Sequence, residues 1–255
     1  MLIPSGLGLT PVLCKSVSNG KPDPTWLRPT YCSVSRAMTR DGTGGWRRPL
    51  SKGELALQDR QQLRREMRAL RRAVTDEQQS AVAVGLARMA ARLRLLRPGR
   101  RVAVYFSQGR EADLSCVIAL ARRRGCRLYL PAITHRRHNR MEFVRFDADA
   151  KLRRNAFGIL EPDVRKAQRI AVRQLDLILV PLVAVDSRGA RLGSGAGFYD
   201  RRLHHLQSDR PWRRPKLIGV AYEFQRLQQL ELQPWDVPLD AVITDLGYYP
   251  TRHRT

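Results

Sequence analysis

The residue types that could do chemistry gather most densely at positions 186–200, in the run DSRGARLGSGAGFYD. Glycines alternate with other residues at positions 193, 195 and 197, after Arg191 and before Asp200. Glycine lets the backbone approach a ligand closely and turn its N–H groups toward an anion. Arg191 adds a planar set of charged donors for phosphate, and Asp200 a carboxylate that could hold a divalent cation. The run indicates a phosphate cradle, or the tight structural turn that glycine clusters also form.

This loop fits neither of the two common phosphate-binding fingerprints. The dinucleotide pattern requires another glycine in phase, whereas position 198 is Phe, and the P-loop requires a Gly-Lys-Ser/Thr sequence that is absent. The spacing alone therefore leaves the phosphate site and the structural turn as open alternatives.

The segments around the loop predict the elements that position it. Two short apolar runs, Leu175–Val180 and Leu182–Val185, flank Pro181 and are typical of strands buried on both faces. The sequence Asp-Ser-Arg-Gly at positions 186–189 predicts a turn, and Phe198 is expected to open a helix. The loop then lies between a strand and a helix, where backbone N–H groups and the helix dipole favour anions.

Upstream, a strand–helix–strand order predicts a parallel sheet. Val102–Phe106 and Leu128–Pro131 have strand character, and Leu114–Arg124 between them is expected to be a helix. Ligands bind at the carboxyl ends of such strands. Further on, the pattern predicts an antiparallel strand at Met141–Phe146, a strand at Leu217–Ala221 and a short helix at Phe224–Leu230.

The region from Lys52 to Ala91 is expected to be helical. Leu63, Met67 and Leu70 recur at helical spacing, with arginines around the rest of the surface. Thr75 followed by Gln at position 78 predicts a capping box, so a second helix should start there.

Composition bounds the class of protein. The chain has 255 residues and a formal net charge of +24, which nucleic-acid binding or solubility could each explain. The arginines are spread along the chain, and no zinc-finger, RNA-recognition or basic-zipper signature is present. No two of the four cysteines have Cys-x-x-Cys spacing, and no apolar run approaches the ~18 residues of a membrane span.

Residues 1–50 differ from the rest in being dense in Pro, Gly, Ser and Thr without any regular period. We expect a disordered extension, followed by one folded domain at residues 51–250. The Arg- and Ser-rich, acid-poor composition of the extension weakly resembles an organellar transit peptide, and an over-extended gene start is the alternative.

The run VPLVAVDSRGARLGSGAGFYDRRL resembles the signature of the 5-formyltetrahydrofolate cyclo-ligase (5,10-methenyltetrahydrofolate synthetase) family. The matching positions are Pro181, Asp186, Gly189, Arg191, Leu192, Gly193, Gly195, Gly197, Phe198, Tyr199 and Asp200. The chain departs from the family pattern at Leu182, Val185 and Ala196, and Trp235 stands where His is usual.

The resemblance implies an α/β fold of three layers (α/β/α), with a mostly parallel sheet similar to that of sugar-phosphate isomerases. It implies ATP- and Mg²⁺-dependent conversion of 5-formyltetrahydrofolate, which could be polyglutamated, to 5,10-methenyltetrahydrofolate, with release of ADP and phosphate.

The resemblance also implies roles for individual residues. Arg191 and Tyr199 are expected in catalysis, Phe106 and Glu111 in folate binding, and Asp200 and Asp236 in holding Mg²⁺. The expected ATP contacts are Arg60, Arg64, Arg191, Leu192, Gly193, Ser194, Gly195, Ala196, Gly197, Phe198 and Tyr199. From the residues alone, Glu111 could instead be an acid at the start of the following helix, and Asp240 is expected to be structural.

Two rival classes remain at this stage. One is a sugar-phosphate isomerase or ligand-binding regulator on the same type of sheet, which would not require ATP. The other is a basic nucleic-acid-binding protein, whose affinity would fall steeply with salt. We expect a cytoplasmic monomer without membrane association, or an organellar protein if the extension is a transit peptide.

Overall fold

The computed structural model describes residues 60–135, 140–150, 152–154, 158, 160–162, 168–208, 215–231, 233 and 235–251. The predicted extension, residues 1–50, lies outside the described residues, as do residues 51–59 of the expected catalytic domain.

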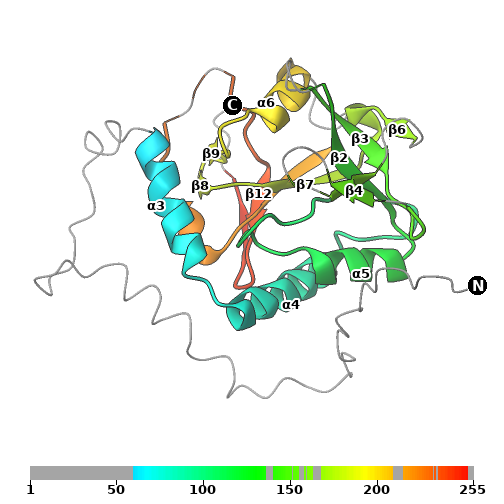
Figure 1. Cartoon of the computed structure of the whole chain (residues 1–255), viewed down its shortest axis with the longest axis horizontal. Coiled ribbons are helices and arrows are strands. Elements are labelled where there is room, and N and C mark those ends of the chain that lie inside the picture. Colours follow the sequence, from blue (N-terminus) through cyan, green and yellow to red (C-terminus); the bar gives the residue numbers. More distant parts are fainter. Residues whose placement is uncertain are drawn as a thin grey trace, which may run out of the picture. The chain divides into compact units, whose positions relative to one another are not determined.

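The centre of the fold is an eight-stranded mixed sheet with strand order β13-β12-β10-β7-β1-β2-β3-β6 (Figure 1). Its strands are β1 (Arg101–Ala103), β2 (Arg127–His135), β3 (Arg140–Arg145), β6 (Arg169–Ile170), β7 (Leu177–Pro181), β10 (Lys216–Val220), β12 (Ala241–Ile243) and β13 (Tyr248–Pro250). The five strands from β12 to β2 pair in parallel, and the pairings at both edges are antiparallel. The α/β class is confirmed.

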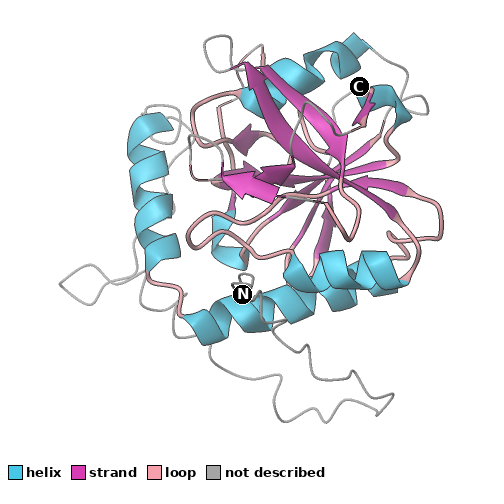
Figure 2. Cartoon of the chain, turned by 45° about the vertical axis from the view of Figure 1, so that its right-hand side comes forward, coloured by secondary structure: helices cyan, strands magenta, loops and turns pink. Residues whose placement is uncertain are grey.

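Four α-helices belong to the described part of the chain: α3 (Arg60–Arg72), α4 (Asp76–Arg92), α5 (Ser115–Arg123) and α6 (Phe198–Leu203). Helices α4 and α5 run together along one face of the sheet, and α6 lies on the other (Figures 1 and 2). The capping box at Thr75 is confirmed, since its side chain accepts from Gln78 N while the Gln78 side chain accepts from Thr75 N. No helix in the described ranges is long and apolar enough to cross a bilayer.

The other strands of the described residues form two smaller sheets. One joins β11 (Arg226–Leu227), β8 (Ala184–Asp186) and β9 (Arg191–Leu192), and the other joins β4 (Leu152–Arg154) and β5 (Leu160–Pro162). The 3₁₀ turns within the described ranges are η2 (Val172–Gln174), η3 (His204–Ser208) and η5 (Glu223–Gln225).

The prediction of a helix at Phe224–Leu230 is wrong. A 3₁₀ turn ends at Gln225, after which β11 pairs in parallel with β8. The N–H of Leu230 donates to the Asp186 carboxylate at 3.0 Å. The backbone groups of this segment thus find their partners in β8 and its turn, and tertiary pairing overrides the local helical pattern.

The turn predicted after β8 is confirmed and is fixed by Asp186. Its buried carboxylate accepts from the N–H groups of Arg188 at 2.9 Å and Ala190 at 3.0 Å. Gly189 has φ +82°, a conformation that favours glycine. The turn returns the chain antiparallel to β8 as β9, which places Arg191 and the glycine-rich loop.

Helix α3 packs on the small β11-β8-β9 sheet through its apolar side. Leu63 and Met67 are buried in a cluster with Val183, Ala184, Ala190, Leu192 and Leu230. This packing directs the neighbouring arginine side chains of α3 toward the loop that follows β9, with the hydrogen bonds described below. Burying the apolar stripe therefore also fixes a row of positive charge beside the loop.

Candidate active site at the glycine-rich loop

Residues 193–197 form the connection between β9 and α6. Gly195 has φ +115° and Gly197 has φ +66°, so the loop uses backbone conformations that other residues rarely adopt. Gly197 is the N-cap of α6. Because α6 has only six residues, the predicted help from its dipole is small, and the loop itself with its neighbours must supply most of any anion binding.

Arginines of α3 hold this loop in place. Arg64 Nε donates to the carbonyl oxygen of Gly193 at 2.9 Å, and Arg68 Nη2 donates to that of Ser194 at 2.8 Å. Arg60 lies one turn earlier on the same face and donates to Asp236 Oδ2 at 2.9 Å. Because these arginines are four residues apart, their side chains lie on one face of α3, and this face supports the loop.

On one side of the loop lies a charged cavity of about 560 Å³. Its lining comprises Arg60, Arg64, Gly193, Gly195, Gly197, Asp200, Arg201, His204, Trp235 and Asp236. Three arginines and two aspartates around a glycine loop suit a polyanion that brings a cation with it.

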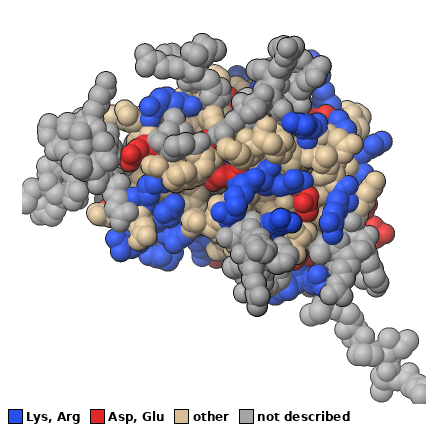
Figure 3. All heavy atoms as spheres, turned by 90° about the horizontal axis from the view of Figure 1, so that it is seen from above, with Lys and Arg blue, Asp and Glu red and all other residues tan. Residues whose placement is uncertain are grey.

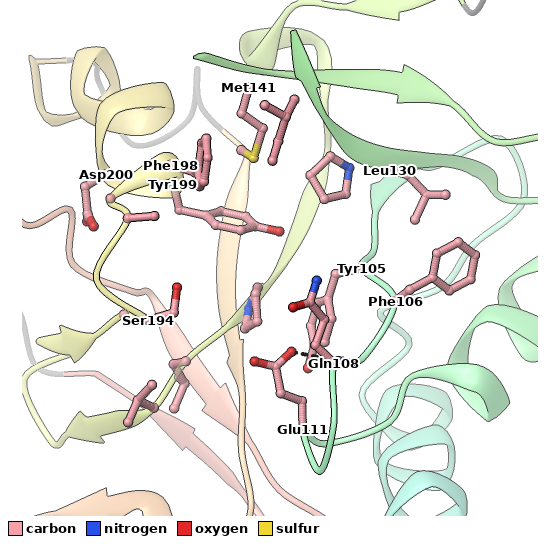
Figure 4. A pocket seen from close by; sticks show the side chains of 18 of the residues that line it. Tyr105, Phe106, Gln108, Glu111, Leu130, Met141, Ser194, Phe198, Tyr199 and Asp200 are labelled. Atoms are coloured by element: carbon pink, nitrogen blue, oxygen red, sulfur yellow. Dashed lines mark hydrogen bonds between the residues drawn. The ribbon is translucent and has the colours of Figure 1, made fainter. Parts of the chain in front are cut away.

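On the other side lies a more apolar pocket of about 240 Å³, shown in Figure 4. Aromatic and aliphatic side chains form most of its wall, including Tyr105, Phe106, Leu130, Met141, Phe198 and Tyr199. Gln108, Glu111 and Glu161 add polar groups. Gly193, Gly197 and Asp200 line both this pocket and the charged cavity, so the loop is the wall that the two share.

Glu111 is the carboxylate of the apolar pocket that structure and sequence both single out. Its Oε1 accepts from Arg71 Nη1 at 3.3 Å and its Oε2 from Gln108 N at 3.2 Å (Figure 4). Burial raises the pKa of Glu111, and the nearby Arg71 opposes part of that rise. The alternative for Glu111 was an acidic side chain that stabilises the start of the following helix. In the structure Asp113 lies there, and its Oδ1 accepts from Ser115 N at 3.2 Å at the start of α5.

Tyr199 extends from α6 into the apolar pocket, and its ring meets that of Phe143 edge-on at 6.4 Å (Figure 4). Burial raises the pKa of its hydroxyl, so the group stays protonated at neutral pH and can donate a hydrogen bond. Phe106 also lines the pocket, while its ring packs edge-on against Phe146 at 5.4 Å. Phe106, expected in folate binding, and Tyr199, expected in catalysis and ATP binding, thus line the same pocket.

Arg191 lies in a different environment from the one its sequence position suggests. Its side chain is only 2% exposed, and it donates to Asp200 Oδ1 at 2.5 Å and to the carbonyl oxygen of Val237. Burial lowers the pKa of Arg191, and Asp200 opposes that shift. Arg191, which lines the apolar pocket, therefore ties β9 to α6 and to the Asp236–Val237 segment.

Asp200 and Asp236 are far apart in sequence but line the same charged cavity. Asp236 accepts from Arg60 and from Gln233 N, and both hydrogen bonds of Asp200 to described residues use Oδ1. No cluster of three or more His, Cys, Asp or Glu side chains suited to a metal occurs among the described residues. Two carboxylates fit Mg²⁺, which takes one or two from a protein and completes its shell with phosphate oxygens and water.

The remaining expected ATP contacts divide between the two sides of the loop. Ser194, Ala196 and Phe198 line the apolar pocket, whereas Gly195 lines the charged cavity. Leu192 is buried beneath α3, so only its backbone could reach a nucleotide.

Sequence reasoning missed Arg68, Arg71, Tyr105 and Glu161 as parts of the site. The signal for Arg68 was available, because positions 60, 64 and 68 recur every four residues on α3. For Glu161, buried and accepting from Ile133 N at 3.0 Å, only the fold reveals its place beside the pocket.

Comparison with known proteins gives a consistent result. Residues 56–245 match the model of the 5-formyltetrahydrofolate cyclo-ligase family. The chain is 34% identical over 184 residues to the 5-formyltetrahydrofolate cyclo-ligase of Haemophilus influenzae, covering 71% of this chain and 95% of the relative. For the Escherichia coli K12 cyclo-ligase, the identity is 33% over 181 residues, covering 70% and 96%. The NMR structure of Aquifex aeolicus 5,10-methenyltetrahydrofolate synthetase superposes with a TM-score of 0.64 at 28% identity, covering 77% of this chain and 94% of that one.

Proposed function

This chain belongs to the 5-formyltetrahydrofolate cyclo-ligase family, and we propose that its glycine-rich loop mediates ATP-dependent closure of 5-formyltetrahydrofolate to 5,10-methenyltetrahydrofolate. The observation that carries the proposal is the shared wall. The loop separates a pocket suited to a pterin from a cavity suited to a triphosphate, and Gly193, Gly197 and Asp200 line both.

In this reaction the formyl oxygen must first be converted into a leaving group. The formyl oxygen attacks the γ-phosphorus of ATP and the bond to ADP breaks, which leaves phosphate on the former formyl oxygen. N10 then attacks the formyl carbon and loses its proton, and the C–O bond breaks to release phosphate. Such a transfer depends on positioning and charge neutralisation more than on a protein nucleophile.

The chain's residues supply those two requirements. In this proposal Arg60, Arg64 and the loop backbone bind the phosphates, while Arg191 holds the junction at which the formyl oxygen and the γ-phosphate meet. Tyr199 donates a hydrogen bond in the folate pocket, and Phe106, Phe198 and Glu111 orient the pterin. Closing the pocket around the ligand limits the access of water to the activated carbon.

Asp200 and Asp236 would hold Mg²⁺, which would neutralise phosphate charge when bound. Both carboxylates line the charged cavity, and the Asp200 Oδ2 makes no hydrogen bond to another described residue.

We also propose that the protein is a monomer, that its folate substrate can carry a polyglutamate tail, and that it is located in the cytoplasm or in an organelle. The three-layer description similar to sugar-phosphate isomerases stays a prediction, supported by helices on both faces of the sheet.

The metal assignment predicts that Asp236→Asn weakens the use of Mg²⁺. A lost metal carboxylate should raise the Mg²⁺ concentration for half-maximal turnover by about 10-fold or more. The measurement is a Mg²⁺ titration at saturating folate and ATP. Asp240→Asn is the control, because Asp240 Oδ2 accepts from Leu217 N at 2.7 Å and serves the sheet. An Asp236→Asn titration curve identical to that of Asp240→Asn would remove Asp236 from the metal site.

Glu111→Gln is expected to raise the folate KM or lower kcat while leaving ATP affinity unchanged. Because burial raises the pKa of Glu111, the carboxylate form is lost as the pH falls through a value above the usual ~4.3. The kcat/KM for folate should therefore show an acid limb there, and Glu111→Gln should lack it. Asp113→Asn, one residue before the α5 N-cap Leu114, alters the acceptor of the Ser115 N–H and should cost about 1 kcal/mol of stability with unchanged kinetics.

The test of the function is incubation of the purified chain with 5-formyltetrahydrofolate, ATP and Mg²⁺, following the near-ultraviolet absorbance of the methenyl product. A folded preparation that forms no product with any nucleotide would contradict the proposal. A sugar-phosphate-binding protein would show no ATP dependence.

For a nucleic-acid-binding protein, the affinity would fall with salt and be indifferent to folate. On the face in Figure 3, Lys and Arg side chains form separate groups with Asp and Glu among them, which is not the continuous stripe such a function favours.

A further inference from the structure

Trp235 is an exposed aromatic side chain at the charged cavity. It is 60% exposed, and among the described residues the only other large apolar side chain in that state is Leu246 at 59%. A tryptophan can bury about 150–250 Å² of surface, so leaving it in water forgoes a large apolar contact. An exposed tryptophan at the edge of a ligand cavity indicates that a ligand covers it.

The backbone that carries Trp235 is held firmly. Asp236 N donates to Gln233 O at 3.0 Å and closes a turn, while Gln233 N donates to Asp236 Oδ2 at 3.1 Å. Arg60 then ties the turn to α3 through Asp236 at 2.9 Å and the carbonyl oxygen of Glu231 at 3.1 Å. The ring is thus presented from a fixed position beside an arginine of the phosphate cavity.

The distribution of aromatic rings distinguishes the two cavities. Tyr105, Phe106, Phe198 and Tyr199 all line the apolar pocket, and none of them lines the charged cavity. In the charged cavity, Trp235 is the only Phe, Tyr or Trp of the described lining, and His204 is the other ring. Arginines and one large aromatic face together suit a ligand that joins phosphates to a planar base.

We propose that Trp235 stacks on the base of the bound nucleotide and makes the site favour purine over pyrimidine triphosphates. This inference rests on the proposed function, since it takes the charged cavity as the ATP site. Purines present a larger face than pyrimidines, so the preference follows from the area of contact with the ring.

Equilibrium binding tests the proposal with ligands that separate base from phosphates. Calorimetry with ATP, CTP and inorganic tripolyphosphate, each with Mg²⁺, is performed on the full-length chain and on Trp235→Ala, Trp235→Phe and Leu246→Ala. The original chain should bind ATP about 10-fold more tightly than tripolyphosphate, with CTP between them. Trp235→Ala should lose that advantage while its affinity for tripolyphosphate stays the same.

The two other variants serve as controls. Trp235→Phe keeps an aromatic face and should retain most of the preference for ATP. Leu246→Ala removes the other exposed apolar side chain, at the turn before β13, and should leave all three affinities unchanged. An undiminished preference for ATP in Trp235→Ala would overturn the proposal.

Fluorescence provides a second readout. The chain has four tryptophans, so the signal of Trp235 is the difference between the full-length chain and Trp235→Phe. Acrylamide quenching of that signal should decrease when ATP binds and should not change with tripolyphosphate. If a segment of the chain already covers the ring, quenching will be weak without nucleotide and unaffected by ATP, which would contradict the proposal.

These results distinguish the inference from the function on which it rests. A chain that forms methenyl product with ATP, and whose Trp235→Ala variant keeps its full preference for ATP, loses only the stacking role. A chain that binds neither ATP nor tripolyphosphate and forms no product loses the proposed function as well.

Discussion

Asp200→Asn is expected to lower the melting temperature by roughly 10 °C and to reduce turnover at least about 100-fold. The carboxylate is the counterion of Arg191, whose side chain is 2% exposed, and the two groups are 2.5 Å apart. Removing one partner leaves a buried charge unpaired, which typically costs about 3–5 kcal/mol of stability. The loss of turnover follows because Asp200 lines both cavities and is a proposed Mg²⁺ ligand.

A double variant separates the structural from the catalytic part of this effect. Arg191→Met combined with Asp200→Asn removes both charges, so most of the melting temperature should return while turnover stays lost. Thermal unfolding and steady-state kinetics on the same preparations measure the two quantities. An unchanged melting temperature in Asp200→Asn, or full turnover in the double variant, would contradict this assignment.

Gly189→Ala is expected to destabilise the protein by about 4 kcal/mol or more, a size seen for few single substitutions. Gly189 has φ +82°, and a Cβ there would lie 2.4 Å from the Leu239 carbonyl oxygen and 3.1 Å from Leu239 N. Backbone atoms cannot move aside as the end of a side chain can. The collision would separate the turn before Arg191 from the segment that carries Asp236, so activity should fall with stability.

Gly125→Ala is the matched control for this substitution. Gly125 also has positive φ, at +69°, but a Cβ there would meet nothing within 4 Å. It should therefore cost only the backbone strain of about 1–2 kcal/mol. The free energy of unfolding from urea titrations compares the two variants. Equal losses would show that the close approach to Leu239 contributes nothing.

The sequence predicted the parts of the fold whose signals are local. The apolar run Leu175–Val180 overlaps all of β7 except its last residue, Pro181, and the Thr75–Gln78 capping box begins α4 where expected. Hydrophobic runs and caps depend on neighbouring residues, so they can be recognised without the fold. The Phe224–Leu230 helix was wrong for the converse reason, since β8 lies about forty residues earlier in the chain and supplies its partners.

In the site, too, the features with local sequence signals could be predicted and those that depend on distant residues could not. The glycine loop could be located from its own residues, and in the structure Arg60, Arg64, Asp200 and Asp236 line the charged cavity beside it. What could not be predicted was the state of each charge. Arg191, expected to bind phosphate, lines the apolar pocket but is buried and paired with Asp200, and α3 supports the loop through Arg68. Pairing and burial depend on side-chain positions from several elements, which sequence spacing does not contain.

The most direct test of the central claim is the fate of the formyl oxygen. The substrate is prepared with ¹⁸O in the formyl group and converted with ATP and Mg²⁺, and the released phosphate is analysed by mass spectrometry. The proposed transfer across the glycine-rich loop predicts one ¹⁸O atom in phosphate for each methenyl product formed. If methenyl product forms but the phosphate carries no ¹⁸O, and the ¹⁸O is found in water instead, the proposal is contradicted.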